Sequence, residues 1–88
     1  MAKVIWSIPA LSDLDAIADH IALDKSEAAK QLVRKVFEYI GQLRDDPQSG
    51  SKPPELKGWR YRQIVEGPCR IFCRHEEDRV IILHVMRG

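Results

Sequence analysis

A chain of 88 residues is long enough for one small domain, and its 44% hydrophobic and 31% charged residues are typical of a globular fold. No apolar run approaches the roughly 20 residues of a membrane-spanning helix, and the apolar stretch at the N-terminus is too short for a signal peptide. We therefore expect a single domain over residues 1–88 that works in the cytoplasm and makes no contact with a membrane.

Charge is spread unevenly along the chain. Residues 1–51 carry six basic and eight acidic side chains, a net charge of −2, whereas residues 52–88 carry eight basic and five acidic ones, a net charge of +3. The second half holds six arginines: Arg60, Arg62, Arg70, Arg74, Arg79 and Arg87. Because arginine favours bidentate contacts to carboxylate or phosphate, this half is expected to meet an acidic partner.

The first elements predicted are a short strand and a helix. Residues 3–8 alternate, with Val4, Trp6 and Ile8 on one face, which predicts a strand. Pro9 suits the first turn of a helix, with Ser7 or Ser12 as its N-cap. Apolar residues then recur at helical spacing: Leu11, Leu14, Ile17, Ala18, Ile21 and Ala22. The acidic residues of this segment are expected on the opposite, solvent side, where the first two favour the helix dipole: Asp13, Asp15 and Asp19.

A second amphipathic helix is predicted after a short break. Residues 24–27 interrupt the pattern and can cap this helix. Its apolar stripe consists of Ala29, Leu32, Val33, Val36, Ile40 and Leu43. The helix should end by Pro47, because proline disfavours a helical residue before it. Two helices so closely connected form an αα-hairpin.

The rest of the chain predicts a loop and three strands. Residues 47–58 hold three of the five prolines and two of the five glycines, which indicates a long loop, anchored to the core by Leu56. Strands are expected over residues 59–65, 69–74 and 79–86, joined by short turns into an antiparallel meander. Residues 80–83 are apolar on both faces, as in a central, covered strand. The fold class is α+β in the order β-α-α-β-β-β, with the hairpin on one face of the sheet and the other face partly open.

The two cysteines and their neighbours do not indicate a metal centre or a disulfide. Cys69 and Cys73 on one strand lie about 13 Å apart, too far for a disulfide. They share a strand face with His75, and His84 is expected nearby, but the spacing lacks the close cysteine pairs of structural zinc sites. We expect two buried thiols, no metal and no cofactor.

Several segments, in order, resemble the ParE toxins of the RelE/ParE superfamily. The strand with Trp6, the run from Leu11 to Ile17 followed by Ile21-Ala22, and the pair Ala28-Ala29 resemble the first part of these toxins. Pro47-x-x-Gly50 and Glu55-Leu56 resemble the segments after the second helix. The run Gly67-Pro68-Cys69-Arg70-Ile71-Phe72-Cys73-Arg74 resembles the family's Pro-Tyr-Arg-Ile-x-Tyr-Arg, with cysteine at both tyrosine positions, and residues 80–85 resemble its closing strand.

The resemblance implies a toxin of a type II toxin–antitoxin pair, neutralised by a small antitoxin. ParE members poison DNA gyrase, whereas RelE members are ribosome-dependent mRNA endonucleases. Many RelE members carry a tyrosine near the C-terminus, but the tyrosines here are Tyr39 and Tyr61. This difference favours non-enzymatic inhibition of gyrase. One alternative is an mRNA endonuclease, with His84 as base and Arg62 and Arg70 as phosphate clamps. Another is a non-toxic protein-binding module.

The residues expected to contact the target are Trp59, Arg60, Arg62, Arg70, Arg74 and Arg87. Residues two apart on a strand share a face, so Arg60 goes with Arg62, and Arg70 with Arg74. The alternative is a solvated sheet face whose arginines pair with Glu66 or Glu76. Trp59 and Tyr61 could equally stack on a partner or fill the core. The antitoxin is expected in hydrophobic grooves of the helical hairpin and along an exposed sheet edge.

Overall fold

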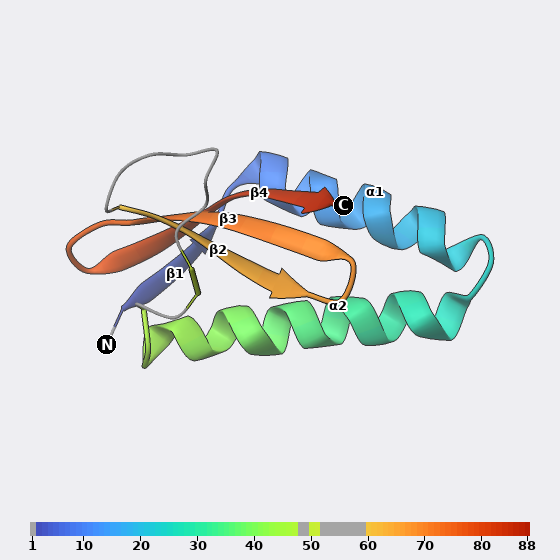
Figure 1. Ribbon diagram of the computed structural model, residues 1–88, viewed down its shortest axis with the longest axis horizontal. Helices are drawn as coiled ribbons and strands as arrows, with labels where there is room; N and C mark the ends of the chain where they lie inside the picture. The colour runs from blue at the N-terminus through green and yellow to red at the C-terminus, as the bar shows by residue number, and fades with distance from the viewer. Residues whose placement is uncertain (1, 48–49, 52–59) are drawn as a thin grey trace.

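Two helices and a four-stranded sheet follow one another in the predicted order. The computed structural model describes residues 2–47, 50–51 and 60–88. Its elements are β1 (Lys3–Trp6), α1 (Ile8–Ala22), α2 (Ser26–Gly41), a 3-10 turn (Gln42–Arg44), β2 (Tyr61–Glu66), β3 (Cys69–His75) and β4 (Arg79–Arg87) (Figure 1). Trp59, with which the first strand of the meander was predicted to begin, and Leu56, the predicted loop anchor, lie outside the described residues.

The strands form one mixed sheet in the order β1-β4-β3-β2. β1 runs parallel to β4, whereas β4, β3 and β2 form the predicted antiparallel meander. The prediction that the last strand is central is therefore confirmed. Gly67, in the turn between β2 and β3, has φ +55°, a conformation that only glycine adopts without a steric penalty.

The start of α1 is fixed by Ser7. The Oγ atom of Ser7 accepts a hydrogen bond from the backbone N–H of Ala10 at 3.1 Å, which makes Ser7 the N-cap. The helix therefore begins at Ile8, and its first turn contains no acidic residue. The prediction that Asp13 and Asp15 favour the helix dipole is wrong, because both lie beyond that first turn, where the effect fades.

α2 supplies the longer buried stripe. Its buried residues recur at helical spacing: Ala29, Leu32, Val36 and Ile40. Lys25 occupies the N-cap position, but no side chain makes a capping hydrogen bond there. The predicted cap within residues 24–27 is thus present in position only, since a lysine side chain has no acceptor to offer. The helix ends at Gly41 and tightens into the 3-10 turn ahead of Pro47, where the sequence predicts its end.

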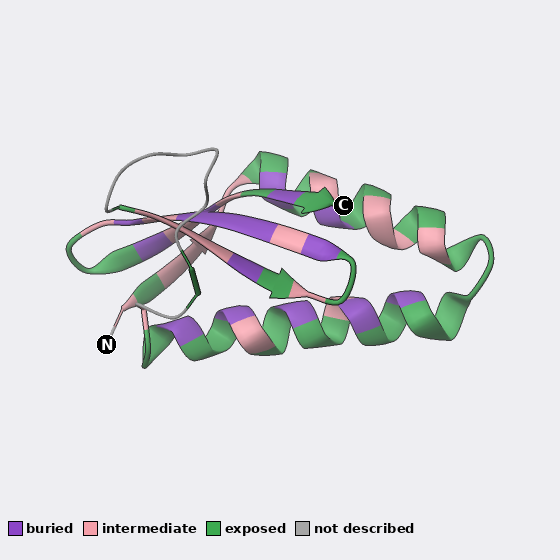
Figure 2. Ribbon diagram, viewed as in Figure 1, coloured by how far each residue is buried: buried purple, intermediate pink, exposed green. Residues whose placement is uncertain are grey.

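The core lies between the helices and one face of the sheet. In Figure 2 the buried positions of α2 lie along the side that faces the strands, and β3 is buried over most of its length. Alternate residues of β3 contribute to this layer: Cys69, Ile71, Cys73 and His75. The predicted arrangement, with the hairpin over one face of the sheet, is confirmed. No helix among the described residues is long and apolar enough to cross a membrane.

Candidate target-binding face

The sheet has a covered face, which packs on the helices, and an open face, which points away from them. The pairing register assigns each strand residue to one face, because neighbours along a strand alternate. The open face consists of Lys3 and Ile5 on β1, Arg79, Ile81, His84 and Met86 on β4, Arg70, Phe72 and Arg74 on β3, and Tyr61, Gln63 and Val65 on β2. These twelve positions are the candidate site.

The open face is basic. It carries Lys3, Arg70, Arg74 and Arg79. The one carboxylate within the four strands, Glu66, pairs with Cys69 and so belongs to the covered face. Three of the six arginines of the second half, joined by Lys3 from the first, thus lie on one side of the sheet, where they favour an acidic partner.

Arg70 is held firmly near the middle of this face. Its Nε and Nη2 atoms both donate to Oε1 of Gln63, at 3.2 and 2.8 Å. Its guanidinium lies over the ring of Phe72, 5.1 Å from the centroid. Phe72 is 5% exposed although it points to the open face. Arg70 is therefore oriented by a cation–π contact and by a neighbour on β2 before any partner arrives.

Arg74 and Arg79 share one carboxylate at the end of the face near the β3–β4 turn. Glu76 accepts from Nη2 of Arg74 at 3.1 Å and from Nε of Arg79 at 2.6 Å. The hydrogen bond from Arg79, together with the charges of both arginines, holds the pKa of Glu76 below its ordinary value. The alternative in which an arginine of the sheet pairs with Glu76 is therefore observed for Arg74.

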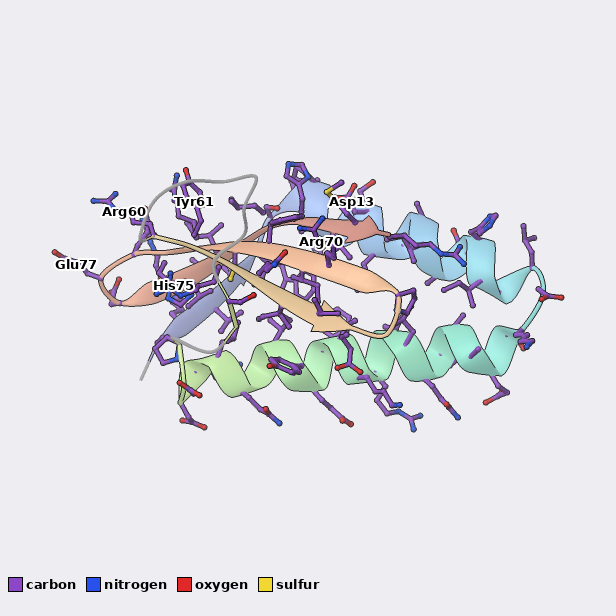
Figure 3. The ribbon with its side chains drawn as sticks, in the orientation of Figure 1. Asp13, Arg60, Tyr61, Arg70, His75 and Glu77 are labelled. Atoms are coloured by element: carbon purple, nitrogen blue, oxygen red, sulfur yellow. The ribbon has the colours of Figure 1, made fainter. Side chains whose placement is uncertain are left out.

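Of the other predicted target-contact residues, Trp59 lies outside the described residues and two arginines are not on the open face. Arg62 pairs with Cys73 and Arg87 with Cys69, which assigns both to the covered side. The carbonyl of Arg60 accepts a hydrogen bond from the N–H of His75 at 2.6 Å, at the far end of the sheet from Arg70 (Figure 3). The structure brings Arg70 and Arg74 together, and it separates them from Arg60, Arg62 and Arg87.

Arg62 instead lies near a buried thiol and imidazole. Nε2 of His75 is 3.9 Å from Sγ of Cys73, and this Sγ contacts the carbonyl of Arg62 at 3.5 Å. Burial raises the pKa of Cys73 to about 11, and burial followed by the charge of Arg62 lowers the pKa of His75. His84, which the sequence placed near the cysteines, pairs with Phe72 and belongs to the open face. Both cysteines are free and buried.

Asp13 fastens α1 to an irregularity in β4, which the sequence did not predict. The register of β3 and β4 shifts between Phe72 and Cys73, leaving Leu83 as the extra residue of a β-bulge. Oδ2 of Asp13 accepts from the backbone N–H of Val85 and from Nδ1 of His84, both at 3.1 Å. Asp13, labelled on α1 in Figure 3, is therefore a structural link rather than a solvent-facing charge. The sequence pattern carries no signal for it, because the bulge arises only on pairing.

Ser7 makes the same junction from the start of the helix. Its hydroxyl donates to the carbonyl of Leu83 at 3.0 Å, and its N–H donates to the carbonyl of Ile82 at 3.0 Å. β1 stops pairing with β4 at Trp6, which leaves the following edge of β4 without a neighbouring strand. Ser7 and Asp13 form hydrogen bonds with the backbone groups of residues 82–85 along this edge. We call these contacts the bulge clamp.

An apolar groove of about 520 Å³ is formed by residues of both helices. It is lined by Ile8, Leu11, Ser12, Leu14, Asp15, Val33 and Phe37. Ile8 is 83% exposed, and Phe37 is 44% exposed although its ring packs against that of Trp6, with the centroids 4.9 Å apart and the planes tilted by 42°. Such an exposed apolar surface is typical of a protein-docking site.

Comparison with known proteins agrees with this architecture. The family profile described as the ParE toxin of the type II toxin–antitoxin system parDE matches residues 4–88. A protein of Sinorhizobium fredii named "Putative toxin Y4kP" is 31% identical over 86 residues, which are 98% of this chain and 88% of the relative.

Solved structures of toxin–antitoxin systems contain chains with the same fold as this protein. A chain of the chromosomal ParDE system from P. aeruginosa is 26% identical with a TM-score of 0.80, and the match covers 99% of this chain and 96% of that one. A chain of the toxin–antitoxin complex RelBE2 from Mycobacterium tuberculosis has the same fold, at 22% identity and a TM-score of 0.67, with coverage of 99% and 91%. Given the profile match over nearly its whole length, the chain belongs to the ParE toxin family of type II toxin–antitoxin systems.

Proposed function

We propose that this toxin inhibits DNA gyrase by binding it without chemical catalysis, and that the open face makes the contact. The observation that carries the proposal is the charge of this face. Its strand residues include one lysine and three arginines but no carboxylate. A basic surface with a fixed arginine near its centre suits a large acidic partner. Since gyrase acts on the chromosome, the toxin would act in the cytoplasm.

The arrangement of the arginines supports binding over cleavage. Cleavage of RNA requires a base at the ribose hydroxyl and cations at the phosphate, all around one substrate. Cleavage would need His84, Arg70 and Arg62 around one phosphate, but Arg62 lies on the covered face of the sheet and the other two lie on the open face. That separation counts against the complete set.

A second candidate, ribosome-dependent mRNA cleavage, is favoured by one contact. Because a carboxylate only accepts, Nδ1 of His84 carries the proton that it donates to Asp13. In the neutral imidazole this leaves Nε2 as an acceptor, on a side chain that is 60% exposed. A histidine oriented in this way can serve as a general base, and Arg70 lies on the same face.

The toxin's partner in the cell is an antitoxin, as its family implies. We propose that an amphipathic antitoxin helix occupies the groove between α1 and α2, with apolar side chains against Ile8, Leu11 and Phe37. A strand of the antitoxin could extend the sheet at β2, which is an edge strand. Because Ser51 already pairs with Gln63 on this edge, an added strand would pair with the part of β2 beyond Gln63.

The two candidate activities can be separated with purified protein. A supercoiling assay with gyrase is run beside an mRNA cleavage assay on programmed ribosomes. Inhibition of gyrase with intact mRNA supports the proposal. Cleavage of mRNA that His84→Ala abolishes would replace it with the second candidate. Inactivity in both assays would leave a non-toxic binding module.

A further inference from the structure

The open face has two unlike ends. Near the β3–β4 turn, Arg74 and Arg79 share Glu76, so much of their charge is compensated within the chain. At the opposite end, the register aligns Val65, Arg70 and Met86 side by side across β2, β3 and β4. We call these three residues the mixed row. The two ends therefore offer a target different chemistry.

The two apolar residues of the mixed row are exposed, and Arg70 between them is half-buried. Val65 is 61% exposed and Met86 is 51% exposed. An arginine flanked by apolar side chains resembles the centre of a protein interface, where burial of the apolar neighbours excludes water from the charged pair. Phosphate groups and the polar edges of nucleotides gain nothing from a valine and a methionine, and nucleic-acid interfaces are more polar and more densely charged.

Arg70 is also prepared for a specific contact. Because Gln63 and Phe72 already hold its guanidinium, binding costs less side-chain entropy than it would for a mobile arginine. The orientation is set by neighbours on the open face itself. The mixed row therefore presents an arginine of fixed orientation between two apolar side chains. A partner must match this row in shape as well as in charge.

We infer that the mixed row is the primary target contact, and that it takes a protein segment presenting a carboxylate between two apolar side chains. This inference rests on the proposed function and narrows it, since it assigns recognition to protein surface of gyrase rather than to its bound DNA. The carboxylate meets Arg70, and the apolar groups cover Val65 and Met86. The ion-paired end with Lys3 and Arg79 then contributes long-range attraction and little of the final affinity.

The test compares two double variants on the same face. Val65→Thr with Met86→Gln makes the mixed row polar at nearly constant size, and Lys3→Gln with Arg79→Gln removes charge from the other end. Gyrase binding is measured by biolayer interferometry at low and high salt, inhibition by the supercoiling assay, and binding of a single-stranded oligonucleotide by fluorescence anisotropy. Circular dichroism and the thermal midpoint confirm that each variant folds.

We expect the first variant to bind gyrase at least about tenfold more weakly at both salt concentrations, as for loss of interface hot spots. The second should change affinity by less than about threefold, mainly at low salt. If wild type inhibits gyrase and the first variant inhibits it equally well, the inference is overturned while the proposed function stands. Larger losses from the second variant, with tight and salt-sensitive oligonucleotide binding, would mean that the face recognises a polyanion. A wild-type protein without effect on gyrase would remove both.

Discussion

The covered face and the open face use alternate residues of the same strands, but they are built for different purposes. On β3 the covered positions are buried cysteine, isoleucine and histidine, whereas the open positions include Arg70 and Arg74. Among the strand residues of the covered face, the charged side chains lie toward the ends: Arg62, Glu66 and Arg87. Alternate residues of one strand thus supply the core and the proposed contact surface, and a shift of register by one residue would exchange the two.

The largest difference between the faces is expected from neighbouring isoleucines on β4. Ile82 points into the core and is 0% exposed, whereas Ile81 points to the open face and is half-buried. Ile82→Ala should lower the free energy of unfolding by about 2–5 kcal/mol, through lost burial and a cavity. In a domain of this size that is a large share of the total. Ile81→Ala should cost clearly less.

Urea denaturation followed by circular dichroism measures both variants. Equal losses for Ile81→Ala and Ile82→Ala would mean that the open face is as tightly packed as the covered one, which would remove the distinction between the faces.

The bulge clamp fastens α1 to the edge of β4, and Asp13 is its centre. Asp13→Ala leaves the N–H of Val85 without its acceptor, and a hydrogen bond to a charged group contributes about 1.5–3 kcal/mol. Because Asp13 is partly exposed, water will replace some of this contact, so we expect a loss of about 1–2 kcal/mol. Urea denaturation gives the value, and amide hydrogen exchange at Val85 should accelerate.

Asp15→Ala is the matched control, because Asp15 lies on the same helix two residues on and is exposed. A change of stability in Asp15→Ala as large as in Asp13→Ala would show that helix charge, rather than the link to β4, is responsible.

Much of the fold could be predicted because its signals are local. The helical spacing of Leu32, Val36 and Ile40 and the alternation within β3 each name a buried face, and Ser7 is a recognisable cap. The candidate site was harder, since it depends on which strands are neighbours. Arg62 and Arg70 read alike in the sequence, yet the pairing of β2 with β3 sends them to opposite faces.

The parts that sequence reasoning missed all depend on long-range pairing. Lys3 joins Arg79 on the open face only because β1 adds in parallel to β4. Asp13 acquires its role from a bulge some 70 residues further along the chain. No periodicity within either segment reports on such a contact, because the two partners meet only after the strands have found their register.

A weaker effect of the covered face should appear as a pH dependence of stability through His75. Burial and the charge of Arg62 lower its pKa in the folded protein, whereas the unfolded chain has the ordinary value of about 6.5. Below that value the unfolded state binds a proton that the folded state resists, so stability is complete above about pH 6.5 and falls as the pH is lowered. One proton limits this slope to about 1.4 kcal/mol per pH unit.

The free energy of unfolding of wild type and of His75→Gln, measured by urea denaturation from pH 7.5 to 5, tests this effect. The variant should lose less stability on acidification, although it starts from a lower value. Parallel curves for the two proteins would assign the pH dependence to other groups, such as the carboxylate of Glu76, whose lowered pKa acts in a more acidic range.

The smallest expected effect is the absence of a reaction at the covered face. Cys69 and Cys73 are both 0% exposed, and burial raises the pKa of each thiol, that of Cys73 to about 11. Since the thiolate is the nucleophile, iodoacetamide at pH 8 should leave the native protein unmodified and add two groups in concentrated urea, as intact mass would record. The modification rate at low urea then reports only the opening of the covered face. Modification of Cys69 alone in the native protein would mean that the helices separate from the start of β3 before the sheet itself opens. The packing around Cys73 would then be the more stable part of the covered face.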